Sequence, residues 1–186
     1  HVIGDIHIVG NSVLDNLTEY KDECEYTDKV LVTLHRWENH HWMDEWFKEL
    51  NEVAKKYSNI EFTIPLHHNP AVRKHKDLLT NVNVVPALPH NEMLDLMSKC
   101  KFIITDSGGL QEEGTFLNKK IIVCRDVTER PEGLNTGHLT LCKEPKDLMG
   151  LVDTINRDYI IKESCPYGDG NTAIKVKEIL DGYSNS

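Results

Sequence analysis

Residues 102–113 read Phe-Ile-Ile-Thr-Asp-Ser-Gly-Gly-Leu-Gln-Glu-Glu. The first four form a short apolar run typical of a buried strand, and the residues that follow predict a helix from Gly109 to about Leu117. Two glycines between a strand and a helix allow backbone N–H groups to approach an anion, and the helix N-terminus adds positive potential. Ser107 adds a hydroxyl donor. This stretch favours a phosphate-binding turn, and a tight turn with a helix cap is the alternative.

Strand-like and helix-like segments alternate on both sides of this stretch. Strands are predicted at Lys29–Thr33, Ile60–Ile64 (ended by Pro65), Val82–Val85, Phe102–Thr105, Ile121–Val123 and Leu139–Leu141. Helices are predicted at Ser12–Tyr20, Met43–Tyr57, Ala71–Leu79, Asn91–Cys100 with Asn91 as the cap, Pro145–Asn156 and Thr172–Leu180, after an extended segment at His1–Gly10. Short apolar strands alternating with amphipathic helices indicate an α/β fold, a Rossmann-like, doubly wound parallel sheet covered on both faces.

Three further polar clusters follow predicted strands, in addition to the Thr105–Glu113 turn. They are 35–39 (His-Arg-Trp-Glu-Asn), 65–70 (Pro-Leu-His-His-Asn-Pro) and 125–132 (Arg-Asp-Val-Thr-Glu-Arg-Pro-Glu). The carboxyl ends of parallel strands meet at one edge of a sheet, so all four clusters are expected to converge there. Arg36, Arg125 and Arg130, with the histidines, would concentrate positive charge at that edge. The implied ligand is anionic, and a diphosphate fits best.

Glu113 lies one helical turn after Gly109 and on the same side of the helix. A carboxylate at that distance from a phosphate is well placed to accept hydrogen bonds from ribose hydroxyls. A solvated helix glutamate is the alternative interpretation.

Composition excludes several other classes of protein. The 186 residues carry a net charge of −9 with no basic run, which argues against nucleic-acid or anionic-membrane binding. No apolar run approaches the roughly 18 residues of a membrane span. The five cysteines form no C-x-x-C pair and indicate reduced, mostly buried thiols in a cytoplasmic protein. The ten histidines show no metal-binding spacing, so no metal is expected.

The four clusters together resemble the non-hydrolysing UDP-N-acetylglucosamine 2-epimerases. The segments that carry the resemblance are 9–15 (Val-Gly-Asn-Ser-Val-Leu-Asp), 35–39, 65–70, 105–113, 125–132 and 166–170 (Pro-Tyr-Gly-Asp-Gly). The resemblance implies one half of a glycosyltransferase-B-like architecture of two Rossmann-like domains. Residues 1–20 would be the crossover segment and first helix, and residues 21–186 the C-terminal, UDP-binding domain. On this resemblance, the N-terminal catalytic domain would be absent from this chain.

The resemblance also implies a role for individual residues. Ser107, Gly108 and Gly109 would hold the diphosphate, Glu113 the ribose, Arg130 the phosphate region, residues Leu88–Met93 the uracil, and His35 would assist departure of UDP as the catalytic histidine. Arg36 and His67 match positions that contact a second, activating UDP-sugar in some bacterial members. The carboxylates that transfer protons lie in the N-terminal domain of the family, so the isolated chain is expected to be inactive.

The reaction implied is 2-epimerisation of a UDP-N-acetylsugar by an isomerase of glycan biosynthesis, with no cofactor and with a homodimer as the full-length form. Trp37 stands where the glucosamine enzymes usually carry a second arginine, and Met93 where they have an aromatic residue. Both UDP-N-acetylglucosamine and UDP-N-acetyl-L-rhamnosamine therefore remain open as substrates. The alternatives are a stand-alone UDP-sugar-binding module and the donor-binding domain of a glycosyltransferase. The segment 128–131 (Thr-Glu-Arg-Pro) with Glu132 favours the epimerase over the transferase.

Overall fold

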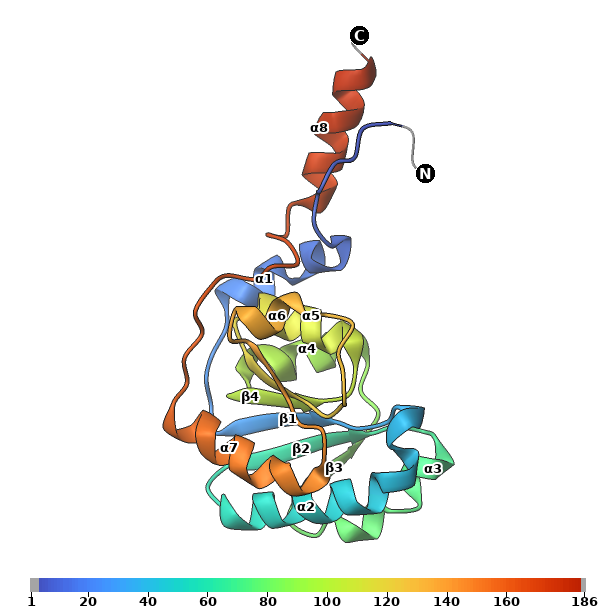
Figure 1. The fold of residues 1–186 in the computed structure, drawn as a ribbon, viewed down its shortest axis with the longest axis vertical. Helices are drawn as coiled ribbons and strands as arrows, with labels where there is room; N and C mark the ends of the chain where they lie inside the picture. Colours follow the sequence, from blue (N-terminus) through green and yellow to red (C-terminus); the bar gives the residue numbers. More distant parts are fainter. Residues whose placement is uncertain (1–3, 185–186) are drawn as a thin grey trace.

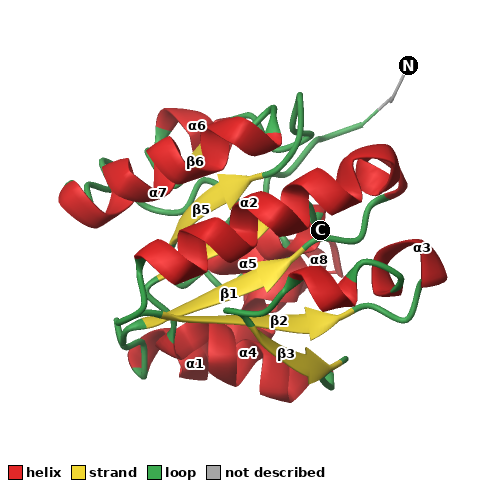
Figure 2. Cartoon of the chain, turned by 90° about the horizontal axis from the view of Figure 1, so that it is seen from below, coloured by secondary structure: helices red, strands yellow, loops and turns green. Residues whose placement is uncertain are grey.

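Six parallel strands form a single sheet in the computed structural model, which describes residues 4–184. The strands are β1 (Lys29–Thr33), β2 (Glu61–Leu66), β3 (Asn83–Pro86), β4 (Phe102–Thr105), β5 (Lys120–Val123) and β6 (Leu139–Leu141). Their order is β3-β2-β1-β4-β5-β6, and each neighbouring pair is parallel. Figure 2 shows helices on both sides of the strands. The predicted doubly wound sheet is confirmed.

Helices cover the two faces of the sheet. The α-helices are α1 (Thr18–Asp22), α2 (Met43–Lys56), α3 (Pro70–Arg73), α4 (His90–Lys99), α5 (Gly108–Phe116), α6 (Glu132–Asn135), α7 (Leu148–Arg157) and α8 (Thr172–Ser184). Short 3-10 helices are η1 (Ser12–Leu17), η2 (Trp37–Trp42), η3 (Lys76–Leu78) and η4 (Pro145–Asp147). The apolar side chains of α2 and α7 pack on one face, and those of η1, α4 and α5 on the other.

The apolar runs of the strands divide between these two cores. In β1, Val30 and Val32 face the core under α2, whereas Leu31 faces the core under α5. Successive side chains of a strand point to opposite faces, so a strand covered on both sides needs an unbroken apolar run. This requirement explains the sequences of β1 and β4, in which residues 30–33 and 102–105 are buried.

Several predicted boundaries were wrong. Pro65 does not end β2, which continues to Leu66; the pairing with β1 ends at Thr63, so Pro65 lies where the strand has one neighbour and proline is tolerated as on an edge strand. Helix α4 begins at His90 after Pro89, with no side-chain cap, so Asn91 lies inside it.

Three predicted helices are divided and one is longer. The stretch 71–79 is divided into α3, which the Asn69 side chain caps, and η3. The stretches 12–20 and 145–156 each begin as a 3-10 helix, and α8 extends beyond Leu180 to Ser184. Residues 4–10 form no strand, and His1–Ile3 lie outside the described residues.

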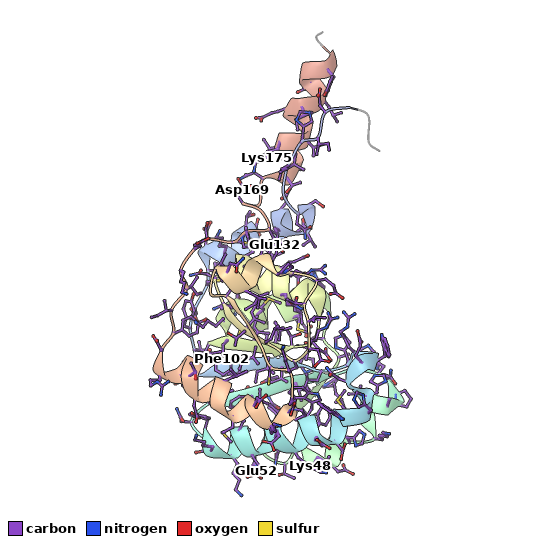
Figure 3. The ribbon with its side chains drawn as sticks, in the orientation of Figure 1. Lys48, Glu52, Phe102, Glu132, Asp169 and Lys175 are labelled. Carbon is purple, nitrogen blue, oxygen red and sulfur yellow. The ribbon has the colours of Figure 1, made fainter. Side chains whose placement is uncertain are left out.

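Helix α8 projects away from the sheet, and the segment before η1 runs beside it (Figure 1). The N-terminus of α8 is held by Asp15, whose carboxylate accepts hydrogen bonds from the backbone N–H groups of Thr172 (3.0 Å) and Ala173 (2.8 Å). Figure 3 marks the base of this projection with Asp169 and Lys175, which form an ion pair of 2.9 Å. Between residues 4 and 184 no helix combines the length and apolarity that crossing a membrane requires.

The cysteines are consistent with the prediction of mostly buried thiols. Cys100, Cys124 and Cys142 are buried, whereas Cys24 and Cys165 are partly exposed, and all five are free.

Candidate functional site

The four polar clusters meet at the carboxyl edge of the sheet. The strand order reverses between β1 and β4, and ligands of open α/β sheets bind outside the carboxyl ends of the strands at such a point. The turn between β4 and α5 and the loop after β1 therefore lie next to each other, although about 70 residues separate them in the chain. The predicted convergence is confirmed by the contacts described below.

Asp106 holds the loop after β1 in place. Its carboxylate is 0 % exposed, and Oδ2 accepts hydrogen bonds from the backbone N–H groups of His35 and Arg36 at 2.9 Å each. The Asn39 amide donates to the same oxygen (3.0 Å) and to the carbonyl of Cys124 (3.0 Å). The other oxygen, Oδ1, lies 3.5 Å from Nδ1 of His35 and has no hydrogen-bond partner in the part of the chain that the structure describes. Asp106 thus holds the backbone of His35 and Arg36 in place.

His35 and His67 come from different clusters and stack on each other. Their ring centroids are 4.9 Å apart and the planes are 16° from parallel. Burial lowers the pKa of His67, and the charge of His35 acts in the same direction. The ring of His40 contacts the carbonyl oxygen of His35 at 3.1 Å. The stacked pair thus joins the loop after β1 to the loop after β2.

The N-terminus of α5 is open above its two glycines. A Cβ atom on Gly109 would meet no atom within 4 Å, and one on Gly108 would lie 3.3 Å from the guanidinium carbon of Arg130. Helix α5 therefore presents free backbone N–H groups toward open space, with a cationic side chain beside them. Ser107 directs its backbone N–H to the Thr105 hydroxyl (2.9 Å).

A buried glutamine connects this turn to the loop that carries Arg130. Gln111 is 0 % exposed; its amide donates to the carbonyl of Ser107 (3.1 Å), and its carbonyl accepts from the Thr128 hydroxyl (2.5 Å). The Thr128 oxygen in turn accepts from the backbone N–H of Arg130 (3.0 Å). Arg130 is therefore positioned relative to Ser107 through two side chains.

The three arginines of the site are paired with carboxylates, so the expected concentration of positive charge was wrong. Arg125 donates to both oxygens of Glu129 (2.8 and 2.9 Å) and lies 3.6 Å from Glu38. Arg36 lies 3.3 Å from Glu38. The hydrogen bond from Arg125 holds the pKa of Glu129 at about 2, with Arg36 and Arg130 acting in the same direction. Alternating charges along this edge neutralise one another while fixing each guanidinium in place.

Glu113 lies in α5, one helical turn after Gly109. This residue is 7 % exposed. Nε2 of His90, at the start of α4, lies 3.2 Å from its carboxylate oxygen Oε1. Burial raises the pKa of Glu113, and the hydrogen bond to His90 opposes that shift. Met93, one turn further along α4, is half-buried against the core under α4 and α5. Glu113 is thus a buried, hydrogen-bonded carboxylate and not a solvated helix residue.

The site has a neighbouring hollow of about 330 Å³ between η2 and the loop after β5. Its lining includes Glu38, His41, Trp42, Arg125 and Lys143. Trp37, at the start of η2, is 76 % exposed. Among residues 4–184, no group of three His, Cys, Asp or Glu side chains could hold a metal ion.

Sequence reasoning missed the structural roles of Asp106, Gln111, Asn39 and His90. A signal was present for Asp106, because an acidic residue directly after a fully buried strand must find buried donors. For Gln111 no signal was present, because a glutamine followed by two glutamates in a helix does not by itself indicate burial. Nothing in the sequence placed His90 opposite Glu113, because that contact depends on how α4 packs beside α5.

Comparison with known proteins identifies relatives over nearly the whole chain. The family described as UDP-N-acetylglucosamine 2-epimerase matches residues 3–181. The UDP-N-acetylglucosamine 2-epimerase of Campylobacter jejuni is 38 % identical over 211 residues, covering 94 % of this chain and 54 % of the relative. The chain thus spans about half the length of the curated relatives it matches.

Solved structures agree with this result. The UDP-GlcNAc 2-epimerase of Neisseria meningitidis bound to UDP-GlcNAc aligns with a TM-score of 0.79 and 32 % identity, over 94 % of this chain and 55 % of that one. An Escherichia coli heptosyltransferase with ADP shares the fold alone, with a TM-score of 0.51 and 19 % identity over 71 % of this chain and 44 % of that one. With the family match extending over residues 3–181, this chain belongs to the UDP-N-acetylglucosamine 2-epimerase family.

Proposed function

We propose that this chain is the UDP-binding half of a UDP-N-acetylsugar 2-epimerase, in which residues 21–186 form the nucleotide domain and residues 1–20 lead into it. Two observations support the proposal. The relatives named UDP-N-acetylglucosamine 2-epimerase extend well beyond the part that this chain covers. The Neisseria meningitidis relative is bound to UDP-GlcNAc in its structure.

The open N-terminus of α5 is the observation that carries the proposal. The diphosphate accepts hydrogen bonds from the backbone of Gly108 and Gly109 and from Ser107, with the guanidinium of Arg130 beside it. Glu113, at the rim, accepts hydrogen bonds from the ribose hydroxyls. The backbone of residues 88–93, at the start of α4, borders the uracil. In this arrangement the ligand pairs with backbone N–H groups at the N-terminus of α5, which have no partner within the helix.

The reaction is an elimination followed by an addition. Loss of the proton from the carbon that bears the acetamido group expels UDP and leaves a glycal. UDP then adds back while a proton arrives from the opposite face, which inverts that carbon. His35, whose backbone N–H Asp106 holds, lies on the nucleotide side and assists departure of UDP. Arg36 and His67, at the same edge, contact a second UDP-sugar.

UDP-N-acetylglucosamine and UDP-N-acetyl-L-rhamnosamine are both candidate substrates. Trp37 is exposed beside the site, and an indole contributes apolar surface where an arginine would contribute charge. The heptosyltransferase likeness concerns the fold alone. A donor-binding domain of a glycosyltransferase, or a UDP-sugar sensor, would bind the same nucleotide without inverting the sugar carbon. Product analysis by NMR on a protein of the relatives' full length therefore separates these functions from epimerisation.

A substitution into the open space at Gly109 tests the nucleotide site. Gly109→Leu places a side chain where the phosphate lies, so we expect UDP affinity to fall by at least tenfold, because the substitution blocks charge-assisted hydrogen bonds to the backbone. Isothermal titration calorimetry with UDP measures this change.

Gly150→Leu is the matched control, because Gly150 in α7 also has no atom within 4 Å of a built Cβ. This variant keeps wild-type affinity. If the two variants bind UDP equally well, the turn before α5 is a structural turn and the proposed site is wrong.

A further inference from the structure

Asn11 lies where two distant parts of the chain cross. Its backbone N–H donates to the carbonyl of Tyr167 at 2.8 Å. Gly10 and Gly168 allow this close approach: a Cβ on Gly10 would lie 3.1 Å from the Cα of Gly168, and both residues have positive φ, +95° and +143°. L-residues with side chains disfavour such backbones, so the crossing requires glycine on both sides.

The side chain of Asn11 reaches a glutamate of α5 that also holds Arg130. Its amide donates to Oε2 of Glu112 at 2.7 Å, and Oε1 of the same carboxylate accepts from Nε of Arg130 at 2.7 Å. The Glu112 side chain is 16 % exposed. Each carboxylate oxygen therefore has one donor, and Asn11 fixes the rotation of the carboxylate that faces Arg130.

Tyr167 closes the connection from the other side. Its hydroxyl donates to the carbonyl of Arg130 (3.0 Å) and accepts from the backbone N–H of Gly133 (3.1 Å). The four residues Asn11, Glu112, Arg130 and Tyr167 thus form a closed ring of hydrogen bonds around one arginine. Figure 3 shows Glu132, the first residue of the adjacent α6, on the side of the domain that faces this crossing.

From this ring we propose that Asn11 is a positioning residue for the phosphate-binding arginine. The inference rests on the proposed function, in which Arg130 contacts the diphosphate. Asn11 touches no ligand itself. It orients Glu112, Glu112 orients the guanidinium over Gly108, and the crossing of residues 10–11 with residues 167–168 thereby sets the strength of phosphate binding.

The side chain of Asn11 has a second role that the test must separate. Its Oδ1 accepts from the backbone N–H of Val13 and caps η1. Asn11→Ser keeps a capping oxygen but lacks the amide donor, and Asn11→Asp keeps the cap while placing a second carboxylate beside Glu112. Loss of one hydrogen bond predicts that Asn11→Ser lowers UDP affinity about two- to tenfold, and like-charge repulsion makes Asn11→Asp worse. The affinity for uridine, which has no phosphate, is unchanged.

Calorimetry with UDP and uridine on the 186-residue chain measures these affinities. Asn171→Ser is the control, because within residues 4–184 the one hydrogen bond that the Asn171 side chain makes is to the carbonyl of its neighbour Asp169. In an Arg130→Ala background, Asn11→Ser has no further effect on UDP. If wild-type protein binds UDP and Asn11→Ser binds it equally tightly, or if uridine affinity falls in parallel, Asn11 does not act through Arg130.

A measurement without ligand separates this inference from the proposed function. Hydrogen exchange of the Arg130 Nε–H, followed by NMR, is slow in the wild type and faster in Asn11→Asp. Failure of the wild type to bind UDP would refute the nucleotide site alone. Unchanged exchange at Arg130 in Asn11→Asp would refute the positioning role, whatever the chain binds.

Discussion

At the scale of single residues, Glu113 is buried and its carboxylate has one hydrogen-bond partner among the described side chains. Its proposed contact with the ribose can therefore be tested by one substitution. The carboxylate contacts only His90 among the described side chains, so it has lone pairs available to accept from ribose hydroxyls. Glu113→Ala should weaken UDP binding by about 1.5–3 kcal/mol, the size of a hydrogen bond to a charged group. Titration calorimetry compares the variant with Glu45→Ala, an exposed glutamate of α2 that lies outside the proposed site. Equal affinities in all three proteins would remove Glu113 from the site.

Burial of His138 leads us to expect that the free energy of unfolding depends on pH. The residue is 1 % exposed, and burial lowers its pKa to about 4 from an ordinary value of 6.5. The folded state thus binds this proton less tightly than the unfolded state. The contribution of the neutral His138 ring to the free energy of unfolding is therefore complete above pH 6.5. This contribution, up to about 3 kcal/mol, is lost as the pH falls toward 4.

Urea unfolding of the wild type and His138→Gln between pH 7 and pH 4 measures this contribution. The variant should lose less stability over that range, because it has no imidazole to protonate. His41→Gln, at an exposed position, is the control and should follow the wild-type curve. Parallel curves for wild type and His138→Gln would show that other groups cause the loss in acid.

At the scale of elements, the packing of α5 on the sheet depends on Gly114. A Cβ there would lie 2.6 Å from Cδ1 of Ile103 in β4 and 2.9 Å from Cδ1 of Ile121 in β5. Gly114→Val should therefore reduce the free energy of unfolding by about 1–3 kcal/mol, the usual cost of overpacking a core. Chemical denaturation measures this against Gly150→Val, where a side chain meets open space. An equal stability of the two variants would mean that α5 can shift without cost.

At the scale of the whole molecule, the ionisable groups of the candidate site gather at one edge of the sheet. The groups on this edge that could transfer protons are His35, Glu38, Glu113, Glu129 and Glu132. Arginines hold Glu38 and Glu129, and His90 contacts Glu113. Inversion at carbon requires a base and an acid on opposite faces of the sugar ring, and residues that share one edge lie on one side of it.

The isolated chain should therefore bind UDP but leave the carbon-bound proton of the sugar unexchanged in deuterated water. Proton NMR of UDP-N-acetylglucosamine and UDP-N-acetyl-L-rhamnosamine over hours follows that signal. The same measurement on a protein of the relatives' full length is the positive control, and the sugar that exchanges there identifies the substrate. Decay of the signal with the 186-residue chain alone would mean that the base lies among His35 and its neighbours.

The succession of the six strands and the longer helices along the chain, and the edge at which polar residues gather, could be predicted from the sequence, whereas the short helices η2 and α6 were not predicted. Burial on both faces demands unbroken apolar runs such as residues 30–33, and amphipathic spacing marks α2 over its full length. Both signals depend on neighbours along the chain. The placement of the turn at residues 105–109 after a strand followed from the same local patterns, as did the expectation that four clusters share one edge.

Only the tertiary structure decided which groups pair within that edge. Asp106 meets His35 because β1 lies beside β4, and Asn11 meets Glu112 across 101 positions of the chain. The arginines expected as free cations are neutralised by Glu38, Glu112 and Glu129, and Pro65 remains in a strand because β2 has a single neighbour there. Hydrogen bonds and ion pairs between distant residues depend on how the elements pack, which local propensity does not specify. The sequence by itself thus determined the elements and the location of the site, whereas the folded structure determined its charge and its internal supports.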